Sequence, residues 1–125
     1  MPYVLGIDTS TTATKALLVE EDGAVAGEAA AEYSFETPQP LWAEQEAGLW
    51  WTATVEAIQK VLAKTGVTGT EVQAIGLTGQ MHGLVLLDEA DQPLRPAILW
   101  NDQRSVAECD EMRATLGRDR LIATT

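Results

Sequence analysis

The chain has 125 residues, of which 46% are hydrophobic and 22% charged, a composition typical of one globular domain. Its formal net charge of −11 argues against a nucleic-acid backbone as a partner, but not against a nucleotide, whose few phosphates need only backbone N–H groups, one lysine and a magnesium ion. A single cysteine, Cys109, an N-terminus without a basic and then apolar leader, and the absence of an apolar run of about 20 residues predict a cytoplasmic protein without a disulfide or a membrane span.

The first third of the chain predicts three antiparallel strands. Residues 3–8 and 14–20 are short apolar runs, and Asp22-Gly23 is a strong hairpin signal between the second run and a third extended segment, residues 24–35. A proline-broken loop at residues 37–43 follows.

A helix is expected from residue 46 to residue 65. Its apolar residues lie at spacings of four, three and four, which predicts one buried stripe made of Trp51, Val55, Ile58 and Leu62. Gly66 suits the C-terminal cap.

The remaining elements are a buried strand at 72–77, a polar loop, a strand at 84–88, a short strand at 97–100 and a helix at 102–117. On that last helix, one face is expected to carry Val106, Cys109, Met112 and Leu116. A strand, a helix and a strand in series imply a parallel crossover, so the fold class is α/β, a mixed sheet with a helix packed on it. No repeat or internal linker divides the chain.

The first candidate site lies between the first two strands. Asp8 ends a strand, the hydroxyl-rich turn Thr9-Ser10-Thr11-Thr12 follows, and Lys15 begins the next strand. Hydroxyls and backbone amides in such a turn can hold phosphate oxygens, with a carboxylate beside them for magnesium. An ordinary Ser/Thr-rich hairpin turn is the alternative, and neither a Walker A loop nor a GxGxxG motif is present.

The second candidate site is the loop that contains Gln80 and the only histidine, His82. Its amide and imidazole groups can bind a ligand, and Gly79 and Gly83 would let the backbone approach that ligand closely. The alternative is a turn with a solvated histidine. A metal-ligand role for His82 is not expected, because no second His or Cys lies nearby.

The third candidate site follows the short strand at 97–100. Trp100 and Asn101 combine an aromatic face with a planar amide, a pairing typical of sugar sites. The alternative is a core tryptophan with Asn101 or Asp102 capping the next helix. Near the first helix, Trp42, Glu44 and Gln45 either face a ligand or only fix the start of that helix.

Together, four stretches resemble the N-terminal part of the FGGY carbohydrate kinases: GIDTSTTATKALLVEEDG, PLWAEQEAGLWW, AIGLTGQMHGLVLLD and LRPAILWNDQRS. The resemblance covers essentially the whole chain, and its QMHG and ILWNDQRS blocks are the specific ones. It implies a ribonuclease H-like, or actin-like ATPase, fold that is incomplete in this chain. Residues 1–125 would then be the N-terminal part of the first of two domains, with the rest of that domain and the second domain absent.

The resemblance also implies roles for single residues. Asp8 would orient the phosphates and magnesium, Thr11, Thr12 and Lys15 would line the phosphate loop, and the sugar would contact Gln80, Met81, His82, Trp100 and Asn101. Many relatives have glycine at the position of Ser10, which suggests a stiffer turn here. Glycerol kinases carry an Arg-Glu pair in place of Met81-His82, which directs the resemblance toward the xylulose-phosphorylating members.

The expected activity of the full-length protein is ATP- and Mg²⁺-dependent phosphorylation of a ketopentose, with D-xylulose converted to D-xylulose 5-phosphate. The catalytic base is expected downstream, so the 125-residue chain alone should be inactive. Alternatives are a kinase for L-ribulose, gluconate, L-fuculose or glycerol, and a non-catalytic actin-like or sugar-sensing module. The partners are a small sugar and ATP, without nucleic acid or a membrane, and a homodimer is left open.

Overall fold

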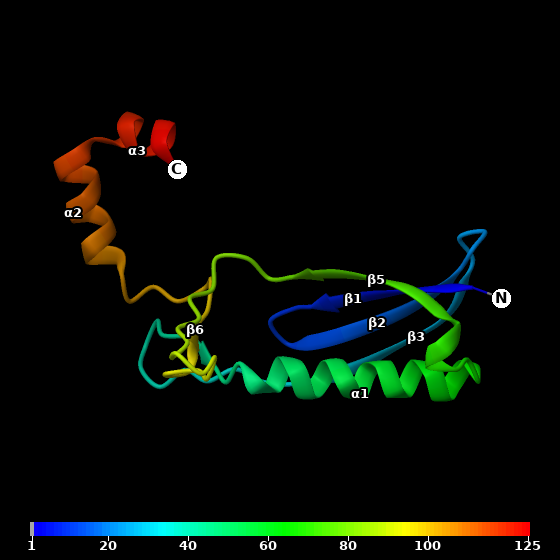
Figure 1. Ribbon diagram of the computed structural model, residues 1–125. Helices are drawn as coiled ribbons and strands as arrows, with labels where there is room; N and C mark the ends of the chain where they lie inside the picture. Colours follow the sequence, from blue (N-terminus) through cyan, green and yellow to red (C-terminus); the bar gives the residue numbers. More distant parts are fainter. Residues whose placement is uncertain (1) are drawn as a thin grey trace.

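The computed structural model describes residues 2–125 and contains a four-stranded mixed sheet in the order β3-β2-β1-β5 (Figure 1). Strands β1 (Tyr3–Thr9), β2 (Ala13–Glu20) and β3 (Val25–Glu32) are antiparallel, and β5 (Val72–Gly79) lies parallel to β1. The three predicted N-terminal strands and the parallel crossover are therefore confirmed.

The hairpin between β2 and β3 turns at Asp22 and Gly23, as predicted. Gly23 has a φ of 90°, a conformation that a glycine adopts without steric cost. The Asp22 carboxylate accepts a hydrogen bond from the Ala24 N–H at 2.9 Å, which closes the turn.

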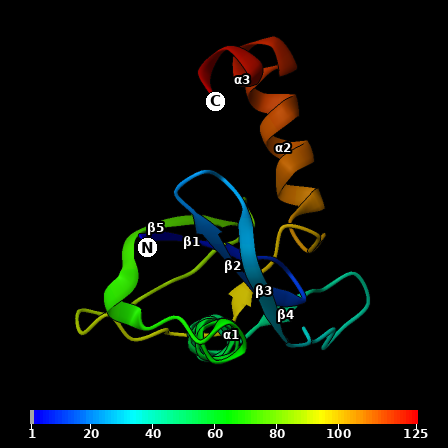
Figure 2. The ribbon, with the colours of Figure 1, turned by 90° about the vertical axis from the view of Figure 1, so that its right-hand side faces the viewer.

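Helix α1 (Gly48–Thr65) packs on one face of the sheet, against β2 and β3 (Figure 2). The predicted stripe is displaced around the helix: Ala53, Ala57 and Val61 are buried, whereas Trp51 is 73% exposed. Small side chains let the helix approach the sheet closely, so the buried face follows the alanines rather than the largest apolar residues. Ile58 and Leu62 pack at the margin of this core.

The end of α1 agrees with the prediction. Gly66 adopts a left-handed conformation with a φ of 73°, and its N–H donates to the Leu62 carbonyl at 2.9 Å. A short 3₁₀ turn, η1 (Gly69–Glu71), then leads into β5.

Strand β5 is not buried, contrary to prediction. It is an edge strand that pairs only with β1 among the described residues, and α1 covers the other half of the sheet. Ile75 and Leu77 are consequently 63% and 76% exposed. Together with Trp50 and Trp51 they line an open groove of about 640 Å³.

The predicted strand at 84–88 is absent. Leu84 and Leu87 make only isolated bridges, to Ile98 and Pro93, within an exposed irregular hairpin. Strand propensity depends largely on the packing of side chains against their neighbours, so leucines that no other element covers do not favour a regular strand here. Only Ala97–Ile98 of the expected strand at 97–100 forms β6, which pairs with β4 (Glu44–Gln45).

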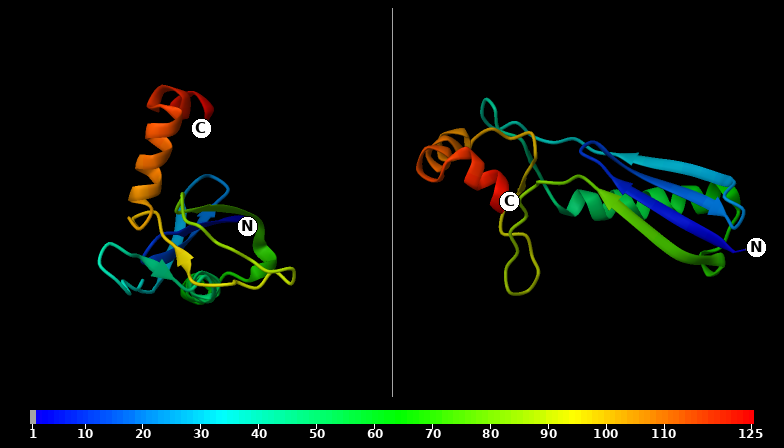
Figure 3. Two further views of the ribbon diagram at one scale, coloured as in Figure 1. Left: turned by 90° about the vertical axis from the view of Figure 1, so that its left-hand side faces the viewer. Right: turned by 90° about the horizontal axis from the view of Figure 1, so that it is seen from above.

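Two helices complete the described chain and stand away from the sheet (Figure 3). Helix α2 (Val106–Leu116) begins four residues later than predicted, and α3 (Arg118–Thr124), which was not predicted, follows Gly117. In residues 2–125, no helix is long and apolar enough to cross a membrane.

Candidate functional site

The candidate site lies where β1 and β5 end side by side. Thr9 and Gly79 are partners in the parallel register, and the Gln80 N–H donates to the Thr9 carbonyl at 2.9 Å. A Cβ on Gly79 would lie 3.2 Å from the Thr9 oxygen, so this glycine permits a close approach between strands rather than to a ligand. Carboxyl ends of neighbouring parallel strands are where open α/β sheets bind ligands.

The turn between β1 and β2 is held through its carbonyl groups. Each carbonyl accepts at least one hydrogen bond. The Thr9 carbonyl accepts from Gln80 N, the Ser10 carbonyl from Tyr33 Oη, and the Thr11 carbonyl from Gln45 Nε2. The Thr12 carbonyl accepts from Tyr33 N, and the Ala13 carbonyl accepts from Ser10 N and Oγ. In residues 2–125 the Thr11 N–H has no acceptor, and the Thr12 N–H reaches only the Ser10 hydroxyl, at 3.5 Å. Two backbone donors are therefore available to an anion, which is the property that a phosphate-binding turn requires.

Ser10 strengthens this turn. Its hydroxyl donates to the Ala13 carbonyl at 2.9 Å and accepts from the Ala13 N–H at 3.2 Å. Its φ is not positive, since the non-glycine residues with positive φ in the described part are Leu41, His82 and Asp91. The backbone here does not need glycine, and the side chain braces the turn, consistent with the stiffer turn that we expected.

The hydroxyl of Thr11 joins two candidate sugar contacts. It donates to Gln80 Oε1 at 3.3 Å and accepts from Trp100 Nε1 at 3.0 Å. Its single proton is committed to Gln80, so the Thr11 hydroxyl can only accept a further hydrogen bond. Any phosphate contact of Thr11 therefore has to use its backbone N–H.

Two buried polar atoms beside this cluster have no partner within residues 2–125: the Gln80 Nε2 donor and the Asn101 Oδ1 acceptor. Buried polar atoms are rarely left unpaired, and exceptions often mark a ligand site. A donor and an acceptor are the groups that a polyol hydroxyl satisfies. Trp100 is 58% exposed, which excludes the alternative that it is a core residue.

Asp8 and Lys15 are cross-strand partners on β1 and β2. Leu5, Ile7, Ala16 and Leu18 pack in the core on the α1 side, so the alternation of side chains points Asp8 and Lys15 to the opposite face. There they line an open cavity of about 420 Å³ with Gly6, Leu17 and Thr78. A carboxylate and an ammonium group next to the turn fit phosphate and metal chemistry.

Magnesium fits this arrangement only through Asp8. The described residues contain no cluster of three or more His, Cys, Asp or Glu side chains that could hold a metal ion. Mg²⁺ does not require such a cluster, because it keeps several waters and is commonly held by one or two carboxylates together with substrate phosphates. The exposed carboxylate of Asp8 suits that mode of binding.

Among the described residues, the predicted site residues other than Thr11, Gln80 and Trp100 make no hydrogen bond within this cluster. Met81 is 71% exposed, and His82 and Thr12 are also exposed. His82 has a φ of 63°, a left-handed conformation that is uncommon outside glycine. Met81 and His82 directly follow Gln80 in the chain and Thr12 directly follows Thr11, so these exposed residues lie next to the cluster without joining it.

An ion-pair cluster is formed by residues that directly follow Trp100 and Asn101 in the chain and by residues of the segment before α1. Asp102 accepts from the Ala43 N–H at 2.7 Å and from Arg104 Nε at 2.8 Å, while Arg104 also pairs with Glu44 at 2.8 Å. The Arg104 guanidinium lies 3.7 Å from the centre of the Trp42 ring. These contacts lower the pKa of Asp102 to about 2, with the hydrogen bond from Arg104 as the main cause.

The alternative that Asn101 or Asp102 caps the next helix is wrong, because the residue at the start of α2 is Ser105. Asp102 is instead committed to Arg104 and Ala43. Glu44 likewise belongs to the ion-pair cluster, where it also contacts Arg95.

Two residues hold the turn in a way that the sequence did not predict: Gln45 was expected to face a ligand or fix the start of the helix, and Tyr33 was not singled out. Gln45 is 2% exposed and donates to the turn, and Tyr33 donates to the Ser10 carbonyl at 2.6 Å. Burial raises the pKa of the Tyr33 hydroxyl, and the Asp8 carboxylate adds to this rise, so Tyr33 remains a donor. A glutamine flanked by apolar and acidic residues carries no signal of such a distant contact.

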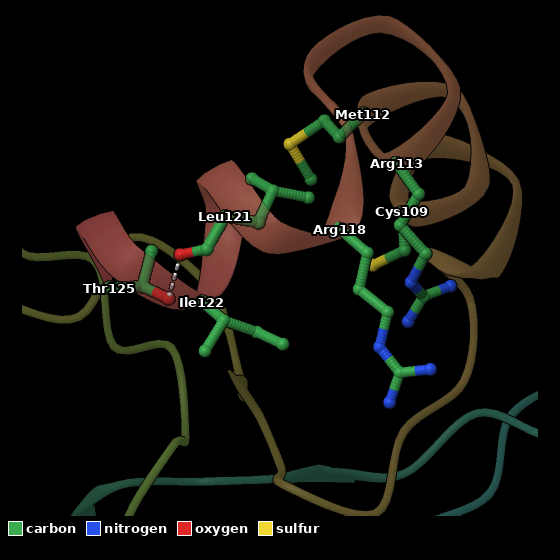
Figure 4. A pocket seen from close by; sticks show the side chains of 7 residues that line it. All are labelled: Cys109, Met112, Arg113, Arg118, Leu121, Ile122 and Thr125. Carbon is green, nitrogen blue, oxygen red and sulfur yellow. Dashed lines mark hydrogen bonds between the residues drawn. The ribbon is translucent and has the colours of Figure 1, made fainter.

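A second large cavity, of about 600 Å³, lies between α2 and α3, away from these residues (Figure 4). Its lining is apolar and basic, with Met112, Leu121 and Ile122 beside Arg113 and Arg118. None of the predicted site residues contributes to it.

The mixed sheet with its packed helix has the actin-like ATPase fold that is found in sugar kinases. The chain belongs to the FGGY family of carbohydrate kinases, whose N-terminal domain matches residues 3–125. This confirms the resemblance and the fold class that the four sequence stretches predict.

Individual relatives and solved structures support this assignment to the family. A xylulose kinase from Staphylococcus xylosus is 37% identical over the whole chain, which covers 26% of that protein. A glycerol kinase from Symbiobacterium thermophilum is 39% identical over 90% of the chain, which covers 23% of it. The crystal structure of xylulose kinase from Rhodospirillum rubrum superposes with a TM-score of 0.87 at 29% identity, over 97% of this chain and 25% of that one. The chain therefore spans about a quarter of the length of the relatives it matches.

Proposed function

We propose that this chain is the N-terminal part of the first domain of an ATP-dependent ketopentose kinase, and that the complete protein converts D-xylulose to D-xylulose 5-phosphate. The chain covers about a quarter of its relatives, so the remainder of the first domain and the whole second domain would lie downstream. A cytoplasmic location suits its lone Cys109.

The hydrogen bonds of the Thr11 hydroxyl are the main support for this proposal. This hydroxyl bonds to both Gln80 and Trp100, while the backbone N–H of the same residue is free for an anion. One residue would thus bring a polyol site and a phosphate site side by side. A kinase needs this proximity, because phosphoryl transfer depends mainly on positioning and charge neutralisation.

Each site residue has a proposed role in this reaction. The Thr11 and Thr12 N–H groups and Lys15 would hold the nucleotide phosphates, and Asp8 would hold Mg²⁺, which supplies positive charge to those phosphates when bound. Gln80 Nε2 and Asn101 Oδ1 would bind sugar hydroxyls, and Trp100 would face the sugar ring or chain. Met81 and His82, which directly follow Gln80, would select the sugar. The base that accepts the hydroxyl proton would come from the downstream part of the protein.

Overall sequence identity does not decide which sugar is phosphorylated, because a xylulose kinase and a glycerol kinase match this chain almost equally, at 37% and 39%. Met81-His82 favours xylulose, because these residues replace a charged Arg-Glu pair and leave this position uncharged apart from the imidazole. Glycerol, L-ribulose, gluconate and L-fuculose are the alternatives within the family.

The test is ADP release by the complete polypeptide with ATP, Mg²⁺ and a panel of these sugars and polyols. D-xylulose should give the highest kcat/KM. A higher value with another sugar would keep the kinase and overturn the substrate. The isolated 125-residue chain should show no turnover, and measurable turnover by it would contradict the proposed downstream base.

A further inference from the structure

Gln45 occupies a position in the fold where its side chain reaches three separate segments. It lies on the short strand β4, paired with Ala97 of β6, and its side chain is fully buried. Its Nε2 donates to the Thr11 carbonyl and to the Ser34 carbonyl, each at 2.9 Å, and its Oε1 accepts from Trp50 Nε1 at 2.6 Å. The amide therefore joins the β1–β2 turn, the segment that follows β3 and the first turn of α1.

Only an amide of this length satisfies all three partners. Both N–H groups of Nε2 are used by carbonyl oxygens, and Oε1 is used by an indole N–H. A glutamate would keep the acceptor for Trp50 and lose both donors, and a methionine would lose all three bonds. Buried polar groups left unpaired are costly, so each replacement has a distinct consequence.

The bond to Thr11 controls the direction of a neighbouring N–H group. A peptide unit is planar and trans, so the Thr11 carbonyl and the Thr12 N–H point in opposite directions. Gln45 draws the Thr11 carbonyl toward the protein interior, which turns the Thr12 N–H outward. Tyr33 acts in the same way on the preceding peptide, because it holds the Ser10 carbonyl and leaves the Thr11 N–H outward.

We propose that Gln45 is a positioning residue of the phosphate site: it orients the Thr11–Thr12 peptide so that its N–H meets the polyphosphate of the nucleotide. This inference rests on the proposed function, since it assumes that a nucleotide phosphate binds at this turn. Gln45 itself touches no substrate.

The experiment compares two variants of the complete polypeptide that remove different bonds of the same amide. Gln45→Met removes the bond to Thr11, whereas Trp50→Phe removes only the bond between the indole and Oε1. Both should lower the Tm. Gln45→Met should raise the KM for ATP about tenfold and change the KM for the sugar by less than about twofold, and Trp50→Phe should leave the KM for ATP within about twofold.

Gln45→Glu provides a second variant if Gln45→Met does not fold. It retains an acceptor for Trp50 and lacks the donors to Thr11 and Ser34, so it should reproduce the rise in the KM for ATP. A fall in Tm with an unchanged KM for ATP, or equal changes in both KM values, would overturn the positioning role.

Direct binding of a non-hydrolysable ATP analogue separates this inference from the proposed function. If the wild-type protein releases no ADP with any sugar, the proposed function fails. The Gln45 inference then still predicts a Kd for the analogue about tenfold weaker in Gln45→Met than in the wild type. Equal Kd values in the two proteins would overturn it.

Discussion

The indole Nε1 of Trp100 donates a hydrogen bond to the hydroxyl of Thr11 at 3.0 Å, across 89 positions of the sequence. The two residues come from different parts of the fold: Thr11 lies in the turn between β1 and β2, and Trp100 follows β6. This bond connects the proposed sugar wall to the phosphate turn. It implies that the Trp100 indole helps to fix the Thr11 hydroxyl and, through it, the Gln80 side chain.

Trp100→Phe in the complete protein tests this connection. The variant keeps an aromatic face and loses the N–H donor, so the Thr11 hydroxyl and, through it, Gln80 lose their fixed orientation. We expect the KM for the sugar to rise about tenfold. Trp51→Phe is the matched control, because Trp51 is 73% exposed and has no side-chain hydrogen bond among the described residues. Equal effects of the two substitutions would contradict the role of the bond.

His82 offers a way to separate side-chain chemistry from backbone strain. Its φ of 63° is tolerated better by asparagine than by alanine. His82→Asn should therefore leave the Tm nearly unchanged and lower kcat/KM for D-xylulose about tenfold, whereas His82→Ala should lower both. Steady-state kinetics and thermal unfolding check this. Wild-type kcat/KM in His82→Asn would exclude the imidazole from sugar selection.

Asp102 should make a contribution to the free energy of unfolding that depends on pH. Its pKa in the folded protein is about 2, below the ordinary value of 3.8, so the ionised carboxylate stabilises the fold. The contribution, about 2 kcal/mol, is present above pH 3.8 and is lost as the pH falls from there through about 2. Asp102→Asn should remove it.

Urea unfolding of the wild type and of Asp102→Asn between pH 2 and 7 measures this contribution. The difference in unfolding free energy should be largest near neutral pH and should shrink below about pH 4. Asp110→Asn is the control, since Asp110 pairs with Arg113 on the surface of α2, where such a pair contributes little. A difference that does not vary with pH would contradict the assigned pKa.

Gly27 tests the close packing of α1 on the sheet. A Cβ at this position would lie 2.5 Å from Thr65 Cγ2, and the Thr65 side chain is held by its hydrogen bond to the Val61 carbonyl. Gly27→Ala should therefore lower the free energy of unfolding by about 1–3 kcal/mol. Gly69→Ala, where nothing lies within 4 Å of the new Cβ, should change it by less than about 1 kcal/mol. Equal stability of the two variants would contradict this packing.

Local patterns in the sequence predicted much of the sheet. The apolar runs that became β1 and β2, the Asp22-Gly23 turn and the Gly66 cap each depend on neighbouring residues, so they can be identified without tertiary information. The buried face of α1 was misplaced because close packing on β2 and β3 favours Ala53 and Ala57 over the larger Trp51. That preference depends on the distance between layers, which the helical period does not contain.

The sequence indicated which residues to examine at the candidate site, but not how they contact one another in the fold. The structure brings Gln80 and Trp100 together at the Thr11 hydroxyl, with Asn101 directly after Trp100, and their roles in sugar binding stay predictions that follow from the family. The contacts of Gln45 and Tyr33 with the turn were not predicted, because they span 34 and 23 positions and leave no periodic signal. Residues that support a site through the backbone are visible only once the fold is known.

The central claim is that this domain serves a kinase that phosphorylates D-xylulose, and sugar-dependent ADP release by the complete polypeptide tests it most directly. With ATP and Mg²⁺, D-xylulose should stimulate ADP release with a higher kcat/KM than L-ribulose, gluconate, L-fuculose or glycerol. ATP binding without stimulation by any of these compounds would contradict the kinase assignment and favour a non-catalytic actin-like or sugar-sensing role.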